Sequence, residues 1–117
     1  MTIEVTSQTV KGVAVIKVDG RVDSVTAPLF ETEADAVVGA TGAPVVLDLG
    51  GVHYISSAGL RVLLKLNKRL RGESREFVLA ALRPDVDDIL VLTGFDKLLD
   101  RHGAVDAAVA SVAVEGA

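Results

Sequence analysis

Short apolar segments along the chain predict strands. Residues 3–9 alternate apolar and polar side chains, with Ile3, Val5 and Ser7 on one face, as in a half-buried edge strand. A turn at Lys11 and Gly12 leads into the next segment, so the first two strands are expected to form a hairpin. The third segment, residues 45–49, is almost entirely apolar, which is typical of a central parallel strand. The later strands are expected at 13–18, closed by Asp19 and Gly20, and at 45–49, 77–80 and 98–100.

Apolar residues at helical spacing predict four helices between and after these strands. Residues 24–28 supply hydroxyl groups and a proline suited to the start of the first helix. The second helix follows Ile55 and ends at Gly72, and the third begins at Pro84 and ends at Gly94. The final helix is expected to bury Val105, Ala108, Val109 and Val112.

The resulting order of elements, ββαβαβαβα, indicates an α/β fold class. We expect one mixed sheet, with the first strand antiparallel at its edge and the helices packed on the sheet. A length of 117 residues suits a single domain. Half of the residues are hydrophobic but only 3% are aromatic, so the core is expected to be aliphatic.

Composition argues against several classes of function. The net charge of −4 disfavours a general nucleic-acid binder, which normally carries a basic excess. Without cysteine, the chain has no disulfide, thiolate zinc site or cysteine nucleophile. His53, expected at a strand end, and His102, expected in a loop, make a poor metal site, and no cofactor is expected.

The ends of the chain predict a cytoplasmic protein without membrane insertion. The N-terminus lacks the basic and long apolar regions of a secretory signal. No uncharged apolar run reaches membrane-spanning length, because charged residues interrupt the apolar C-terminal stretch. We therefore expect a protein partner rather than a nucleic acid or a lipid bilayer.

The segment from Val52 to Leu60 is the best candidate site, because it joins the end of the central strand to the second helix. The first turn of a helix offers unpaired N–H groups and partial positive charge, so a phosphate on a serine there would be stabilised. Ser56 and Ser57 also fit an ordinary helix cap followed by a first-turn residue. Gly59 is costly in a first turn and indicates a close backbone approach, either by a partner loop or within the chain.

The stretch LDLGGVHYISSAGLRVLL, residues 47–64, closely resembles the signature of STAS-domain anti-sigma factor antagonists. Residues 20–24 and 27–30, before the first helix, and residues 92–98, after the third, extend the resemblance. It covers essentially the whole chain and implies a single STAS-type domain over residues 1–117.

The resemblance implies a phosphorylation switch at Ser57. In such systems the unmodified antagonist binds an anti-sigma factor with a histidine-kinase-like ATP-binding fold and releases a sigma factor. That kinase phosphorylates the serine to end binding, and a PP2C-type phosphatase restores the active form. The protein is then a substrate and ligand, not an enzyme. The expected phosphosite surroundings are Asp23, Ser56, Ala58 and Gly59, and the expected partner-binding residues are Ser24, Thr26, His53, Tyr54, Arg61 and Lys65.

Two positions depart from the commonest family motif, Asp-Ser-Ser-Gly. Ser56 replaces its acidic residue and Ala58 replaces its second serine, so the kinase preference is expected to differ. Asp23 matches an acidic family position, but it also fits a turn-forming residue after the second strand. The basic helix face with Arg61, Lys65, Lys68 and Arg69 fits either an acidic partner surface or a solvated face.

Two other functions remain open from the sequence. The first is a non-catalytic STAS adaptor or scaffold in a stress-signalling or transporter complex, in which Ser57 phosphorylation would be incidental. The second is a small hydrolase using Ser57, but the nucleophile-elbow pattern Gly-x-Ser-x-Gly is absent.

Overall fold

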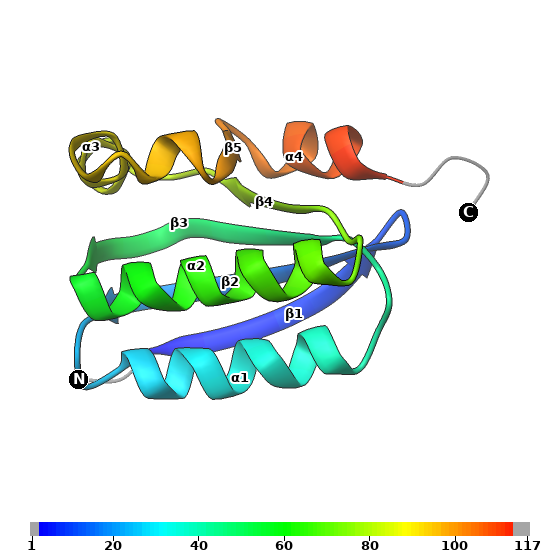
Figure 1. Cartoon of the computed structure of the whole chain (residues 1–117), viewed down its shortest axis with the longest axis horizontal. Coiled ribbons are helices and arrows are strands. Elements are labelled where there is room, and N and C mark those ends of the chain that lie inside the picture. The colour runs from blue at the N-terminus through cyan, green and yellow to red at the C-terminus, as the bar shows by residue number, and fades with distance from the viewer. Residues whose placement is uncertain (1–2, 114–117) are drawn as a thin grey trace.

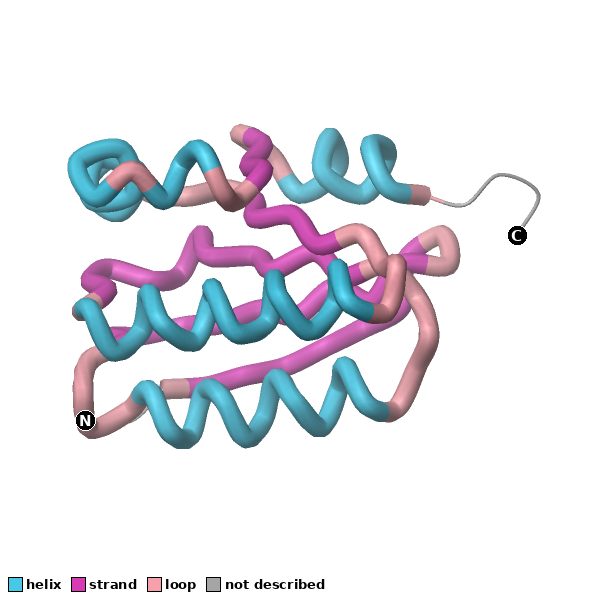
Figure 2. The backbone as a smooth tube through the Cα atoms, viewed as in Figure 1, coloured by secondary structure: helices cyan, strands magenta, loops and turns pink. Residues whose placement is uncertain are grey.

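One mixed sheet of five strands organises the computed structural model, which describes residues 3–113. The strands are β1 (Glu4–Val10), β2 (Val13–Val22), β3 (Val45–Ile55), β4 (Phe77–Ala80) and β5 (Asp100–His102). They lie in the order β1-β2-β3-β4-β5, with β1 antiparallel to β2 and the other neighbours parallel (Figures 1 and 2). The predicted α/β fold class, with an antiparallel first strand at the edge, is confirmed. The outermost positions of the expected domain, residues 1–2 and 114–117, lie outside the described residues.

Both central strands run beyond their predicted ends. β2 continues through Asp19 and Gly20, where a closing turn was expected, and β3 continues past Leu49. The pairing of the two strands shifts register twice in this half, which marks bulges or irregularities. A Cβ on Gly51 would lie 3.2 Å from the Cα of Asp19, so the glycine permits the close passage of β2. Gly20, which was expected to close the second strand, therefore lies at an irregular position within a continuing strand.

Four α-helices follow the predicted order. They are α1 (Ala27–Gly39), α2 (Ser57–Gly72), α3 (Pro84–Thr93) and α4 (Val105–Val112), with a short 3₁₀ helix, η1 (Phe95–Lys97), after α3. Gly94 is the C-cap of α3, as predicted, and it adopts the left-handed conformation. The predicted strand at 98–100 is displaced, because η1 and the turn after it delay parallel pairing until Asp100 meets Val78. His102 therefore pairs with Ala80 inside β5 and does not lie in a loop.

Two mainly aliphatic clusters hold the helices on the sheet. The larger joins one face of the sheet to the buried residues of α1, α2 and α3, and the smaller joins the other face to α4. α1 and α2 lie next to each other along the sheet and begin at the same end, on the left of Figure 1. Ile3, just before β1, and Val5 within it pack toward the larger cluster, whereas Ser7 is exposed and not half-buried as expected. No helix within residues 3–113 is long and apolar enough to cross a membrane.

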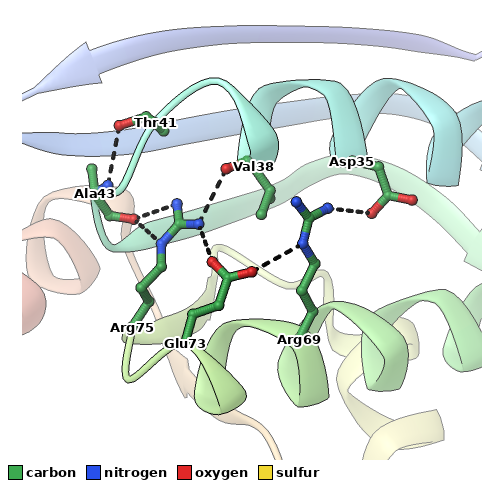
Figure 3. A network of polar contacts seen from close by, with 7 residues as sticks. All are labelled: Asp35, Val38, Thr41, Ala43, Arg69, Glu73 and Arg75. Atoms are coloured by element: carbon green, nitrogen blue, oxygen red, sulfur yellow. Dashed lines mark hydrogen bonds and ion pairs between the residues drawn. The ribbon is translucent and has the colours of Figure 1, made fainter.

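Arg75 ties the far ends of α1 and α2 together (Figure 3). Its guanidinium donates to the carbonyl of Ala43 at 2.7 and 2.9 Å and to that of Val38 at 3.1 Å. Glu73 accepts a further bond from Arg75 at 2.8 Å and lies 3.4 Å from Nε of Arg69. Only 8% of the Arg75 side chain is exposed, so these bonds satisfy a nearly buried charge. The network fixes the spacing of the two helices at the end opposite to where they begin.

Candidate functional site

Ser56 and Ser57 occupy different positions at the start of α2. Ser56 is the N-cap, and its Oγ accepts a hydrogen bond from the Gly59 N–H at 3.3 Å. Its own N–H donates to the Val22 carbonyl at 2.9 Å, which ties the helix start to the end of β2. Ser57 is the first helical residue, it is exposed, and no hydrogen bond engages its hydroxyl within residues 3–113. A group attached to Ser57 would therefore face solvent at the positive end of the α2 dipole.

Gly59 seats the first turn of α2 against the sheet. A Cβ at this position would lie 2.7 Å from side-chain carbons of both Val22 and Ile55, which are buried at the ends of β2 and β3. The close approach indicated by the sequence is thus made within the chain. Gly59 is itself buried, so the partner loop that was the other expectation has no access to it.

Asp23 organises the loop between β2 and α1. Its Oδ1 accepts hydrogen bonds from the N–H groups of Val25 and Thr26 at 2.9 and 3.0 Å. The bond from the Thr26 backbone, helped by that from Val25 and by the Arg21 guanidinium, outweighs desolvation and holds the pKa of Asp23 below its ordinary value of 3.8. Asp23 therefore has the turn-forming role allowed by the sequence, and its Oδ2 lies 3.4 Å from Nε of Arg21.

Thr26 was expected on the partner surface, but the structure buries it. Only 5% of the residue is exposed, and its hydroxyl donates to the Arg21 carbonyl at 2.7 Å while accepting from the Asp23 N–H at 2.9 Å. Both capacities of the hydroxyl are used inside the loop. Thr26 therefore holds the loop in shape, and its side chain is not available to a partner.

Tyr54 and His53 lie at the end of β3 and are both exposed. The Arg21 guanidinium sits 3.8 Å from the centre of the Tyr54 ring, a cation–π contact that joins the ends of β2 and β3. Because Arg21 also pairs with Asp23, one side chain links the Asp23 loop to the aromatic ring. Arg21 was not predicted as a site residue, although it lies in segment 20–24, which is part of the family resemblance.

A groove between α1 and α2 brings four predicted residues together. Its volume is about 170 Å³. Lys65 forms an ion pair across it with Glu31 of α1, with Nζ 3.2 Å from Oε2. Glu31 was not predicted, since the sequence does not show which residue of α1 faces Lys65. The lining residues are Ser24, Ala27, Pro28, Glu31, Ala58, Arg61, Val62 and Lys65.

Two exposed apolar residues around the start of α1 were also missed. Val25, in the loop before α1, is 81% exposed, and Leu29, in the first turn of α1, is 44% exposed. Both are apolar residues in a segment of turn and first-turn residues, and this was the signal for exposure available in the sequence.

The basic face of α2 is partly neutralised within the chain. Arg69 pairs with Asp35 at 3.3 Å, and Lys65 pairs with Glu31. Within residues 3–113, Arg61 and Lys68 form no ion pair and are exposed. The same stretch of chain holds no group of three or more carboxylates and histidines placed to bind a metal ion. The exposed part of this face therefore carries two unpaired cations, Arg61 and Lys68, with the exposed hydroxyl of Ser57 at the start of the helix.

Residues 4–111 match the STAS domain family, and the chain belongs to this family. It is 37% identical to BtrV of Bordetella bronchiseptica, a protein assigned to the anti-sigma factor antagonists, over 93% of this chain and 94% of BtrV. It is 31% identical to the anti-sigma-F factor antagonist RsfB of Mycobacterium tuberculosis, over 82% of this chain and 78% of RsfB. The resemblance stated from residues 47–64 is thereby confirmed.

Solved structures show the same fold. The chain superimposes on an anti-sigma factor antagonist from Mycobacterium paratuberculosis with a TM-score of 0.86 and 33% identity, covering 94% and 93% of the two chains. SpoIIAA in its unphosphorylated form gives a TM-score of 0.75 at 12% identity, over 95% and 98%, which shows the fold alone. These relatives are named as anti-sigma factor antagonists and not as enzymes, so they give no support to the hydrolase alternative.

Proposed function

We propose that this chain is an anti-sigma factor antagonist whose binding is switched by phosphorylation of Ser57. In the unphosphorylated state it binds an anti-sigma factor with a histidine-kinase-like ATP-binding fold and releases a sigma factor in the cytoplasm. The bound partner phosphorylates Ser57, which ends the interaction. A PP2C-type phosphatase removes the phosphate and restores binding.

The exposed hydroxyl of Ser57 carries this proposal. Its neighbour Ser56 is engaged as the cap of α2, so of the two serines Ser57 is the one open to a kinase. The adjacent residue, Ala58, lines the groove between α1 and α2, so a group on Ser57 would lie next to that groove. SpoIIAA, which has the same fold, has been solved in both unphosphorylated and phosphorylated forms, which supports the compatibility of this fold with the modification.

The partner surface we propose combines the groove with the strand ends. It contains Ser24, Arg61 and Lys65 at the groove, with Asp23, His53 and Tyr54 beside the carboxyl ends of β2 and β3. A phosphate adds about −1.5 to −2 charges at neutral pH. A partner that covers Ser57 would bury this charge away from water, where the solvent cannot screen it. Binding is therefore lost without refolding of the chain.

The test is to incubate the chain with the candidate anti-sigma kinase and ATP and to map phosphate by mass spectrometry. We expect modification of the wild type and of Ser56→Ala, and none of Ser57→Ala. Ser56→Ala is the matched control, because it removes the adjacent hydroxyl on the same turn. Phosphate on Ser57→Ala would contradict the assignment. Tight binding to transporter or stress-signalling subunits, with no binding to the kinase, would favour the adaptor function instead.

A further inference from the structure

Arg61 stands four residues after Ser57 on α2. Both side chains are exposed, and residues four apart on a helix lie on the same face, with Cβ atoms about 5–6 Å apart. Arg61 also lines the groove next to the proposed phosphosite. The residue therefore belongs at once to the partner surface and to the neighbourhood of Ser57.

Of the other three cations of the basic face, Lys65 and Arg69 are already paired, and Lys68 does not line the groove. Lys65 is held by Glu31 at 3.2 Å, and Arg69 is held by Asp35 at 3.3 Å and by Glu73 at 3.4 Å. Among the residues lining the groove, Arg61 is the cation without a carboxylate partner in the described part of the chain. The groove thus presents one uncompensated positive charge, which suits an acidic group on the partner.

A phosphate on Ser57 would compete for that charge. An anion followed four residues later by a cation is the favourable order for an ion pair along a helix. The guanidinium can also donate two parallel hydrogen bonds to phosphate oxygens, which lysine cannot do. The N–H groups of the first turn of α2 would add to the stabilisation of the phosphate.

We propose that phosphorylated Ser57 draws Arg61 into an ion pair within α2 and so removes the cation that an acidic group of the anti-sigma factor binds. This inference rests on the proposed function and deepens it. The phosphate then has two effects. It repels the partner, and it neutralises Arg61, the charge on this chain that the partner's acidic group would bind. Arg61 is a positioning residue in this scheme, because it couples the modification to the groove.

The first test needs neither kinase nor partner. Phosphoserine is incorporated at position 57 during translation, and the phosphate is titrated by ³¹P NMR in the wild type, in Arg61→Gln and in Lys68→Gln. We expect the phosphate to lose its last proton at a lower pH in the wild type than in Arg61→Gln. Lys68→Gln, which removes an unpaired cation about three helical turns beyond Ser57, should titrate like the wild type. Identical titration of wild type and Arg61→Gln would overturn the proposal.

The second test measures binding to the anti-sigma factor for wild type and Arg61→Gln, each with and without phosphate. Phosphate should weaken the binding of both proteins to the anti-sigma factor. The fold-change in affinity should be about two to five times smaller for Arg61→Gln than for the wild type, which is the effect expected of an exposed ion pair. Equal factors would overturn the coupling. If the titrations differ but phosphate leaves wild-type binding unchanged, the proposed switch fails together with the competition for Arg61, while the ion pair itself stands.

Discussion

Replacing Gly59 with alanine would add a methyl group where α2 lies closest to the sheet. The new Cβ would lie 2.7 Å from carbons of both Val22 and Ile55, whereas carbon atoms in contact normally lie about 3.5–4.0 Å apart. Both neighbours are buried, so the first turn of α2 must move outward by roughly 1 Å. Such overpacking costs about 1–3 kcal/mol, and alanine returns about 1 kcal/mol of helix propensity. We expect a net loss of about 1 kcal/mol in the free energy of unfolding.

Gly72 offers the matched control, because it is the last residue of the same helix and a Cβ there would meet no atom within 4 Å. Gly72→Ala should be neutral or stabilise the fold by up to about 1 kcal/mol. Urea unfolding followed by circular dichroism measures both variants on one scale. If Gly59→Ala proved as stable as Gly72→Ala, the seating of α2 described above would be wrong.

Three further predictions concern stability. Ser56→Ala should lower the free energy of unfolding by about 1 kcal/mol through loss of the α2 cap, and Ser57→Ala should change it by less than about 0.5 kcal/mol; equal effects in chemical denaturation would contradict the separate roles of the two serines. Arg75→Met should cost about 2–3 kcal/mol, because the carbonyls of Ala43 and Val38 lose their partner, whereas the exposed Arg71→Met should cost at most about 1 kcal/mol; calorimetry should rank them in that order. Hydrogen bonds from Arg75 and Arg69 hold the pKa of Glu73 below its ordinary value of 4.5, and the pKa of Asp23 is likewise depressed below 3.8. A carboxylate whose pKa is lower in the folded than in the unfolded state stabilises the fold at pH values above its unfolded pKa. The free energy of unfolding should therefore fall as the pH drops through 4.5 and below. A Glu73→Gln, Asp23→Asn double variant should lose less of its free energy of unfolding over this range.

Local periodicity was sufficient to predict the helices and the short buried strand β4. The leucines of α2 and the valines of α4 repeat on one face, and Gly94 ends α3 as its position indicated. The ends of β2 and β3 could not be found in this way. Their continuation depends on the close pairing of Asp19 in β2 with Gly51 in the neighbouring strand β3. The sequence alone does not show this pairing, and a glycine taken by itself favours a turn.

The site was predictable where it depends on one segment and not where it depends on distant contacts. Ser56 and Ser57 follow from a helix start, and the cap at Ser56 is as expected. Thr26 was misplaced because its burial arises from bonds to Arg21 and Asp23 that close the loop in three dimensions. The pair between Lys65 and Glu31 joins residues 34 positions apart, a separation at which the sequence pattern gives no partner.

The central claim is that a charge on the exposed Ser57 hydroxyl decides whether the groove between α1 and α2 can be covered by its partner. Isothermal titration of the anti-sigma factor with the unmodified chain, and with the chain carrying phosphoserine at position 57, tests this claim most directly. We expect the phosphorylated chain to bind at least about tenfold more weakly, a difference of about 1.4 kcal/mol or more. Equal affinities for the two forms would contradict the account.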